Sequence, residues 1–331
     1  MTKRSLLFVI LALCLFVLPC LSFGQQAAPT AGTDLFPVML DGRCGYIDRT
    51  GKIVIPPRFD DGWEFYGGLA RVKMGGKYGY IDGAGKVVIP PRFDRTYLFL
   101  EGLAAVGIEG KWGYIDSTAK TVIPLEFDAA WNFSGGIARV RVGDKWGYID
   151  KTGKMILPPR FDDCLGFSDG LAAVVLGGKY GYVDKSGEMV IPPQFEGAWG
   201  FSSGLAAVKV AGKWGYIDKT GKPVIAPRFD TAWSFSGELA PVVMAGKYGF
   251  IDKRGEFAIR PQFDVAWRFA GGLAAVAKGG KWGYIDTTGK VIIPFEFDSA
   301  WDFFKGLGKV WIGEKFGYVD TTGKFIWNPT K

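Results

Sequence analysis

Nine aspartates recur at one spacing in this chain, and as carboxylates they could perform acid–base chemistry or bind cations. Each closes a Gly-aromatic-(Ile/Val)-Asp tetrad that repeats every 34 residues between Gly45 and Gly317. The aspartates are Asp48, Asp82, Asp116, Asp150, Asp184, Asp218, Asp252, Asp286 and Asp320. Catalysis by two carboxylates needs environments that separate their pKa values, whereas these lie one per turn in matching local sequence. We interpret them as structural residues that cap tight turns.

Other catalytic or cofactor chemistry finds little support in the sequence. The chain has no histidine, which removes the commonest general base and imidazole metal ligands. Calcium sites need several oxygen ligands close in sequence, and each turn offers one carboxylate and a hydroxyl. Cys44 and Cys164 lie more than three repeats apart, so we expect two unpaired thiols. The sequence predicts no enzyme, no bound cofactor and no metal site.

A second set of recurring residues is aromatic and could contact a ligand. Phe occurs in eight copies of Arg/Glu/Gln-Phe-Asp/Glu, and four residues later six copies have Trp, with Tyr97 and Leu165 in the other two. We expect most of these rings to be buried between units, because a lone three-stranded meander is marginal in water. Any that face outward could stack on sugars or hold extended peptides. The candidate ligand-contact residues are Trp131, Trp199, Trp233, Trp267 and Trp301.

The elements that position these residues follow from the fixed period, which is the signature of a repeat protein. In each unit two alternating segments flank a two-residue turn, such as Gly75-Gly76, and a second turn follows the tetrad Asp. A third segment ends at prolines, which cannot donate to a strand ladder. Each unit is therefore predicted to be a three-stranded antiparallel meander plus a loop of about a dozen residues.

The nine meanders could form an open array or a closed ring. Propellers often close by sharing one blade between the two termini, but here the first and last units each have all three predicted strands. Nothing is left over to share, so we expect an all-β open β-solenoid, or superhelix, with a closed β-propeller as the alternative.

The first part of the chain differs in composition. Lys3 and Arg4 precede an apolar run that ends near Leu21, which predicts a cleaved signal peptide over residues 1–24. Residues 25–34 read as a flexible lead-in, and 35–331 hold the nine repeats. We therefore expect an exported protein, periplasmic or extracellular, with no membrane span after cleavage. Without Lys3 and Arg4 the net charge falls from +7 to +5.

The recurring Lys-Trp-Gly-Tyr-Ile-Asp, followed by Thr-Gly-Lys and Val-Ile-Pro, resembles the WG (KWG) repeat family over about residues 36–331. The resemblance implies a β-rich repeat protein, mostly bacterial and often exported, with a binding or scaffolding role and no catalytic residues. Charges of both signs alternate through every unit, which argues against nucleic-acid binding. We expect a monomeric scaffold that binds a protein or cell-envelope polymer. The alternative is a carbohydrate- or peptidoglycan-binding module.

Overall fold

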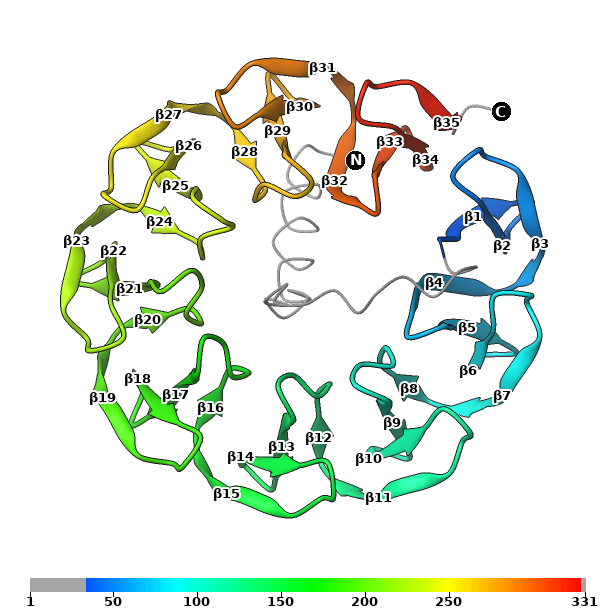
Figure 1. Ribbon diagram of the computed structural model, residues 1–331, viewed down its shortest axis with the longest axis horizontal. Helices are drawn as coiled ribbons and strands as arrows, with labels where there is room; N and C mark the ends of the chain where they lie inside the picture. Colours follow the sequence, from blue (N-terminus) through cyan, green and yellow to red (C-terminus); the bar gives the residue numbers. More distant parts are fainter. Residues whose placement is uncertain (1–33, 329–331) are drawn as a thin grey trace, which may run out of the picture.

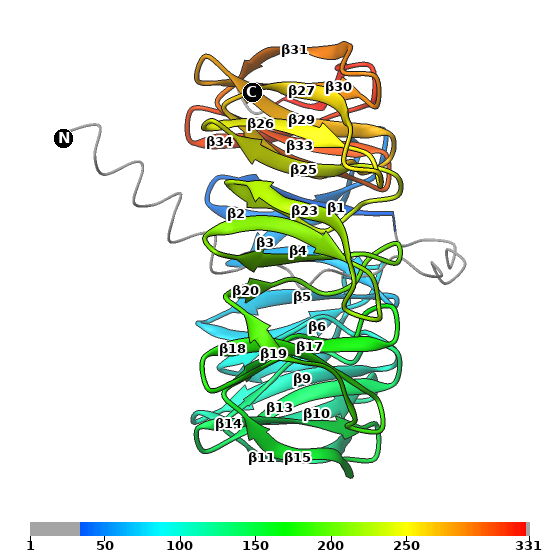
Figure 2. The same ribbon diagram turned by 90° about the vertical axis from the view of Figure 1, so that its left-hand side faces the viewer.

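The computed structural model describes residues 34–328, and they form a closed ring of nine β-sheets (Figure 1). The all-β repeat architecture with nine units is confirmed, but the open solenoid is wrong: the alternative, a closed nine-bladed β-propeller, is the fold. Seen from the side, the ring is a single layer of blades (Figure 2). The predicted signal peptide and almost all of the lead-in lie outside the described residues.

Each blade, numbered 1 to 9 in chain order, is an antiparallel sheet whose strands follow one another along the chain. Strand positions in a blade are counted outward from the centre of the ring, and the innermost position is the first. The strands at the second position are β1 (Phe36–Leu40), β5 (Leu69–Met74), β9 (Leu103–Ile108), β13 (Ile137–Val142), β17 (Leu171–Leu176), β21 (Ala206–Val210), β25 (Ala240–Met244), β29 (Leu273–Lys278) and β33 (Leu307–Ile312). The third strands are β2 (Arg43–Ile47), β6 (Lys77–Ile81), β10 (Lys111–Asp116), β14 (Lys145–Asp150), β18 (Lys179–Asp184), β22 (Lys213–Ile217), β26 (Lys247–Ile251), β30 (Lys281–Asp286) and β34 (Lys315–Val319).

The outermost strands run along the perimeter of the ring (Figure 1). They are β3 (Ile53–Phe59), β7 (Val87–Phe93), β11 (Thr121–Phe127), β15 (Met155–Phe161), β19 (Met189–Phe195), β23 (Pro223–Phe229), β27 (Phe257–Phe263), β31 (Val291–Phe297) and β35 (Phe325–Trp327). Most of them contain prolines at which the sequence predicted the strand to end. The strand continues through these prolines because it is the edge of its sheet, where a missing N–H removes no ladder bond.

The prediction of three strands per unit is also wrong for eight of the nine blades. These blades have a fourth, innermost strand: β4 (Asp61–Tyr66), β8 (Arg95–Thr96), β12 (Ala129–Ala130), β16 (Asp163–Cys164), β20 (Gly197–Ala198), β24 (Thr231–Ala232), β28 (Val265–Ala266) and β32 (Ser299–Phe304). Six of them have two residues, taken from the start of the predicted loop. Among the described residues, blade 1 has no such strand.

The core consists of apolar layers between neighbouring blades. In one layer, Tyr114 and Phe127 of blade 3 pack with Phe133 and Val140 of blade 4, and all four are buried. The same layer joins blades 9 and 1, where Leu307 and Tyr318 pack against Phe36, Val38 and Ile47. The ring therefore closes by face-to-face packing of side chains. Closure needs no blade shared between the termini, which is why the argument for an open array failed.

Two polar contacts support this closing junction between blades 9 and 1. The Tyr318 hydroxyl donates a 2.9 Å hydrogen bond to the carbonyl oxygen of Pro37. Lys305 forms an ion pair with Asp34, with 3.1 Å between Nζ and Oδ1. No helix in residues 34–328 has the length and apolar character needed to cross a membrane.

Candidate functional site

The tetrad Gly lies inside the third strand of each blade, where another backbone segment approaches it closely. In blade 3 the outermost strand bulges opposite Gly113, since Trp112 pairs with Phe127 and Tyr114 with Ile123. A Cβ at Gly113 would lie 2.5 Å from the carbonyl oxygens of Ile123 and Pro124. This position admits no side chain, so the Gly of the tetrad serves strand packing.

The aromatic residue of the tetrad connects neighbouring blades. The Tyr114 hydroxyl donates a 2.7 Å hydrogen bond to the carbonyl oxygen of Trp131 in the next blade, and Tyr216 makes the matching 2.8 Å bond to Trp233. Tyr114 is fully buried. A buried hydroxyl needs such a partner, so this residue both fills the core and orients the loop aromatic of the next blade.

Each tetrad Asp is the last residue of the third strand or follows it directly, at the start of a turn. In blade 4, Asp150 Oδ1 accepts hydrogen bonds from the Thr152 amide (2.8 Å), the Thr152 hydroxyl (2.6 Å) and the Lys154 amide (3.1 Å). The hydroxyl of Thr152 is the largest cause that lowers the pKa of Asp150. Asp82 Oδ1 accepts from the amides of Ala84 and Lys86 but from no hydroxyl at this position, because Ala84 has none. The aspartates are thus placed one per blade.

Four of the candidate tryptophans lie in loops that follow the innermost strands and reach toward the centre of the ring (Figure 1), whereas Trp301 lies within the innermost strand β32. Several of these rings stack on the aromatic residue before the tetrad Gly in the same blade: Trp199 stacks on Trp214, Trp233 on Tyr248 and Trp267 on Trp282. Trp131 instead stacks on Tyr97 of the preceding blade, at 5.2 Å between ring centroids. The loop aromatics are therefore backed by a second ring and held rigidly.

The five candidate tryptophans differ in exposure. Trp131, Trp199 and Trp233 are half-buried, and the Trp199 indole donates to the Ala232 carbonyl oxygen of the next blade at 3.0 Å. Trp267 and Trp301, in the adjacent blades 8 and 9, have exposed fractions of 41% and 46%. Only these two of the five present a largely open indole, so the candidate site narrows to blades 8 and 9.

An ion pair lies directly beside the two exposed indoles in sequence and joins the same two blades. Arg268 Nε donates to Asp302 Oδ2 at 3.2 Å, while Asp302 Oδ1 is buried and has no hydrogen-bond partner among residues 34–328. Burial raises the pKa of Asp302, and the Arg268 charge opposes that shift. The pair thus leaves one acceptor atom unsatisfied near the open rings.

Sequence reasoning missed Arg268 and Asp302. Their position, one residue after the loop aromatic, holds Gly in blades 5 and 6 and Asn132 in blade 4. Its variation among otherwise constant units was the available signal, since the constant positions serve stacking of the blades.

Both predicted free thiols are buried: Cys44 in blade 1 and Cys164 in blade 5 are free cysteines. Burial raises the pKa of Cys44 to about 12 and that of Cys164 to about 11. Leu165, which replaces a loop aromatic, packs against the apolar layer between blades 5 and 6. Within the described part of the chain no three His, Cys, Asp or Glu residues lie close enough together to hold a metal ion.

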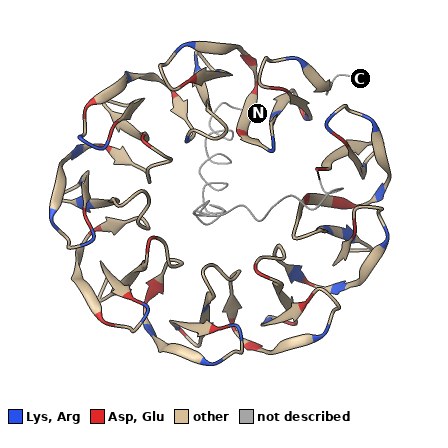
Figure 3. Ribbon diagram, viewed as in Figure 1, with Lys and Arg blue, Asp and Glu red and all other residues tan. Residues whose placement is uncertain are grey.

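Basic residues and acidic residues are both spread around the whole ring (Figure 3). Seven ion pairs of one type cross between blades, each joining the basic residue that begins a third strand to the acid after the outermost strand. They are Arg43–Asp60, Lys77–Asp94, Lys111–Asp128, Lys145–Asp162, Lys213–Asp230, Lys247–Asp264 and Lys281–Asp298.

Comparisons with known proteins agree with the repeat and with the fold. The family described as WG containing repeat matches eight consecutive segments, at residues 45–78, 78–112, 112–146, 146–180, 180–214, 214–248, 248–282 and 282–315. No curated protein matches the chain.

Two solved structures match the chain, and the first of them illustrates the similarity in fold. One, described as a eukaryotic initiation factor, has a TM-score of 0.63 at 10% identity, over 88% of this chain and 95% of that chain. Another, the dihydro-heme d1 dehydrogenase NirN in complex with DHE, has a TM-score of 0.49 at 15% identity, over 84% of this chain and 77% of that chain. At 10% identity the first likeness concerns the fold alone.

Proposed function

The chain belongs to the family of WG containing repeats, and on that premise we propose that its propeller is an exported, non-enzymatic scaffold that binds a protein or a cell-envelope polymer. The carrying observation is the pair of exposed indoles, Trp267 and Trp301, on adjacent blades. Exposed aromatic rings held by a rigid support are characteristic anchors of binding surfaces.

The aromatic ring that lies behind each indole supports the proposal of a binding scaffold. Trp267 stacks on Trp282, and Trp301 packs on Trp311 with 5.5 Å between centroids. A ring fixed in this way loses little conformational entropy when it meets a partner, so more of its buried area contributes to affinity.

A carbohydrate ligand is the second candidate, and the partly exposed Arg268, next to Trp267 in the sequence, favours it. Sugar rings stack their C–H faces on exposed tryptophans and hydrogen-bond through hydroxyls. The Arg268 side chain is partly exposed and supplies donors for sugar hydroxyls. A polysaccharide would therefore find stacking and hydrogen-bonding groups together.

The test uses affinity capture from the cell envelope of the producing organism, followed by mass spectrometry, together with pull-down on purified peptidoglycan. Trp267→Ala and Trp301→Ala should each reduce retention about tenfold or more, as expected for a hot-spot aromatic. Trp233→Ala is the matched control, because Trp233 occupies the same position in blade 7 and is half-buried. Equal retention by all three variants would refute this surface as the binding site.

A further inference from the structure

Eight junctions between blades share a connecting segment. At each of them one outermost strand ends at a Phe, a single acidic residue follows, and the innermost strand of the next blade begins. For example, β11 ends at Phe127, Asp128 follows, and β12 begins at Ala129. We call this Phe and the acid after it the connector.

The connector Phe fills the outer part of the layer between blades. It is buried in all eight junctions. The end of the second strand in the next blade packs against the same apolar layer: Met74 against the layer that contains Phe59, and Ile312 against the layer that contains Phe297. The connector Phe is also the strand-pairing partner of the residue that precedes the tetrad Gly in the third strand, as Phe127 is of Trp112.

The connector acid bonds to both blades. Asp128 Oδ1 accepts from Lys111 Nζ of the preceding blade at 2.7 Å, and its Oδ2 accepts from the Gly143 amide of the following blade at 2.7 Å. Seven of the eight junctions have such a basic–acid pair. At these seven junctions the connector joins the two blades through one apolar and one anionic group.

At the junction between blades 9 and 1, the residues that would contact a connector are present, but the described residues include no connector. Strand β35 has three residues where the other outermost strands have seven, and it ends at Trp327. The 34-residue period places Lys331, not Phe, at the connector position. Lys315, the counterpart of Lys111, has no ion pair within residues 34–328.

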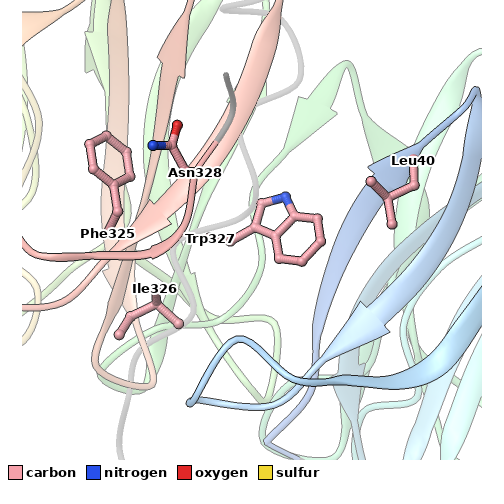
Figure 4. Close-up of a pocket in the computed structure, with 5 residues that line it drawn as sticks. All are labelled: Leu40, Phe325, Ile326, Trp327 and Asn328. Carbon is pink, nitrogen blue, oxygen red and sulfur yellow. The ribbon is translucent and has the colours of Figure 1, made fainter. Parts of the chain in front are cut away.

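A cleft lies at this junction. Its volume is about 400 Å³, and it is lined by Leu40, Phe325, Ile326, Trp327 and Asn328 (Figure 4). Leu40 is the counterpart of Met74 and Ile312, the residues that meet the connector Phe elsewhere. The cleft therefore opens where the other junctions hold the connector Phe.

We propose that this cleft binds an extended segment of a partner protein that has a Phe followed by an acidic residue. The Phe would enter the cleft beside Leu40, and the acid would meet Lys315, as the connector acids meet their basic partners at seven of the eight other junctions. The proposal rests on the scaffold function above and gives it a partner class and a second site, distinct from the indoles of blades 8 and 9.

The ligand probe is a labelled synthetic peptide with the sequence of residues 89–94, Ile-Pro-Pro-Arg-Phe-Asp, titrated with the full chain and followed by fluorescence anisotropy. Replacing Phe93 in the peptide by Ala should weaken binding about tenfold or more, because a buried Phe contributes strongly to affinity. Replacing Asp94 by Lys should weaken it several-fold.

Two variants of the protein test whether the peptide binds in the cleft. Leu40→Arg should abolish binding, and Lys315→Glu should weaken it at least threefold. Lys179→Glu is the matched control: Lys179 also begins a third strand, is exposed and has no ion pair in the described chain, but its junction is filled by Phe195. Thermal melting of each variant checks that the fold is retained.

No binding of the peptide, whether because the cleft is closed or because other residues of this chain occupy it, would overturn the proposal, as would equal binding by the Lys315 and Lys179 variants. Sedimentation of the free protein tests occupation by a second copy, which would also overturn it. Affinity capture with Leu40→Arg separates the two proposals: partners retained unchanged by this variant would leave the scaffold function standing and remove the cleft as its site.

Discussion

Substitution of a tetrad glycine should destabilise this propeller more than a comparable substitution on its surface. Gly147 of β14 faces the bulge of β15, and a Cβ there would lie 2.6 Å from the carbonyl oxygen of Leu157 and 2.8 Å from the nitrogen of Pro159. Ordinary van der Waals contact begins at 3.4 Å, so the backbone of β15 must move by about 0.8 Å. Both clashing atoms belong to the main chain and cannot rotate away.

The cost of Gly147→Ala follows from that displacement. Adding a methyl group to a packed interior costs about 1–3 kcal/mol, and more where the neighbour is backbone, so we expect about 3 kcal/mol. In a chain of this size that should lower Tm by roughly 5 °C or more. Urea unfolding followed by tryptophan fluorescence measures the free energy, and calorimetry measures Tm.

Gly166→Ala is the matched control for this prediction. Gly166 lies in a loop, a Cβ there meets no atom within 4 Å, and its φ is not positive. Its substitution should change the free energy of unfolding by less than about 0.5 kcal/mol. If Gly147→Ala were equally harmless, the close approach of β14 and β15 would not be the reason for the tetrad glycine.

Three further predictions concern hydrogen bonds, protons and thiols. Tyr114→Phe removes the 2.7 Å bond to Trp131 and should lower the free energy of unfolding by about 1 kcal/mol in urea, with the m-value unchanged. The Thr152 hydroxyl lowers the pKa of Asp150 below 3.8 in the folded state. The Asp150 carboxylate therefore stabilises the fold fully above about pH 4, and this stabilisation is lost as the pH falls through the lower folded-state pKa. In an acid titration the free energy of unfolding should fall less steeply with pH for Asp150→Asn than for the unchanged protein, and equal slopes would refute the role of Asp150 as a turn cap. Cys44 and Cys164 are buried with pKa values raised to about 12 and about 11, so iodoacetamide at pH 8 should label them slowly in buffer and rapidly in denaturant, as mass spectrometry would show.

The repeat unit was largely predictable from the sequence because its signals are local. The two-residue turn at Gly75-Gly76 and the turn after each tetrad Asp depend on a few adjacent residues. The innermost strands were missed because most of them, such as Ala129–Ala130, have two residues, which is too short for an alternating pattern to be visible.

Ring closure could not be read from the sequence because it depends on the angle between blades, which side-chain volumes set at every junction. The packing of Tyr318 against Phe36 and Val38 is a contact between the two ends of the chain, with no signal in local periodicity. The exposure of each tryptophan could not be predicted from the sequence either. Trp267 and Trp233 occupy equivalent positions, so residue type alone could not distinguish the exposed indole from the half-buried one.

The absence of a connector in the described residues at the junction of blades 9 and 1 has a mechanical consequence. Tension applied between Asp34 and Asn328 pulls directly on the Tyr318–Pro37 bond and the Lys305–Asp34 pair, whereas every other junction also has a peptide backbone in the path of the load. We expect this junction to open first under force, after which the remaining blades separate one by one in 34-residue steps. The propeller is therefore a ring with a defined point of rupture, and a partner seated at that point would raise the force needed to open it.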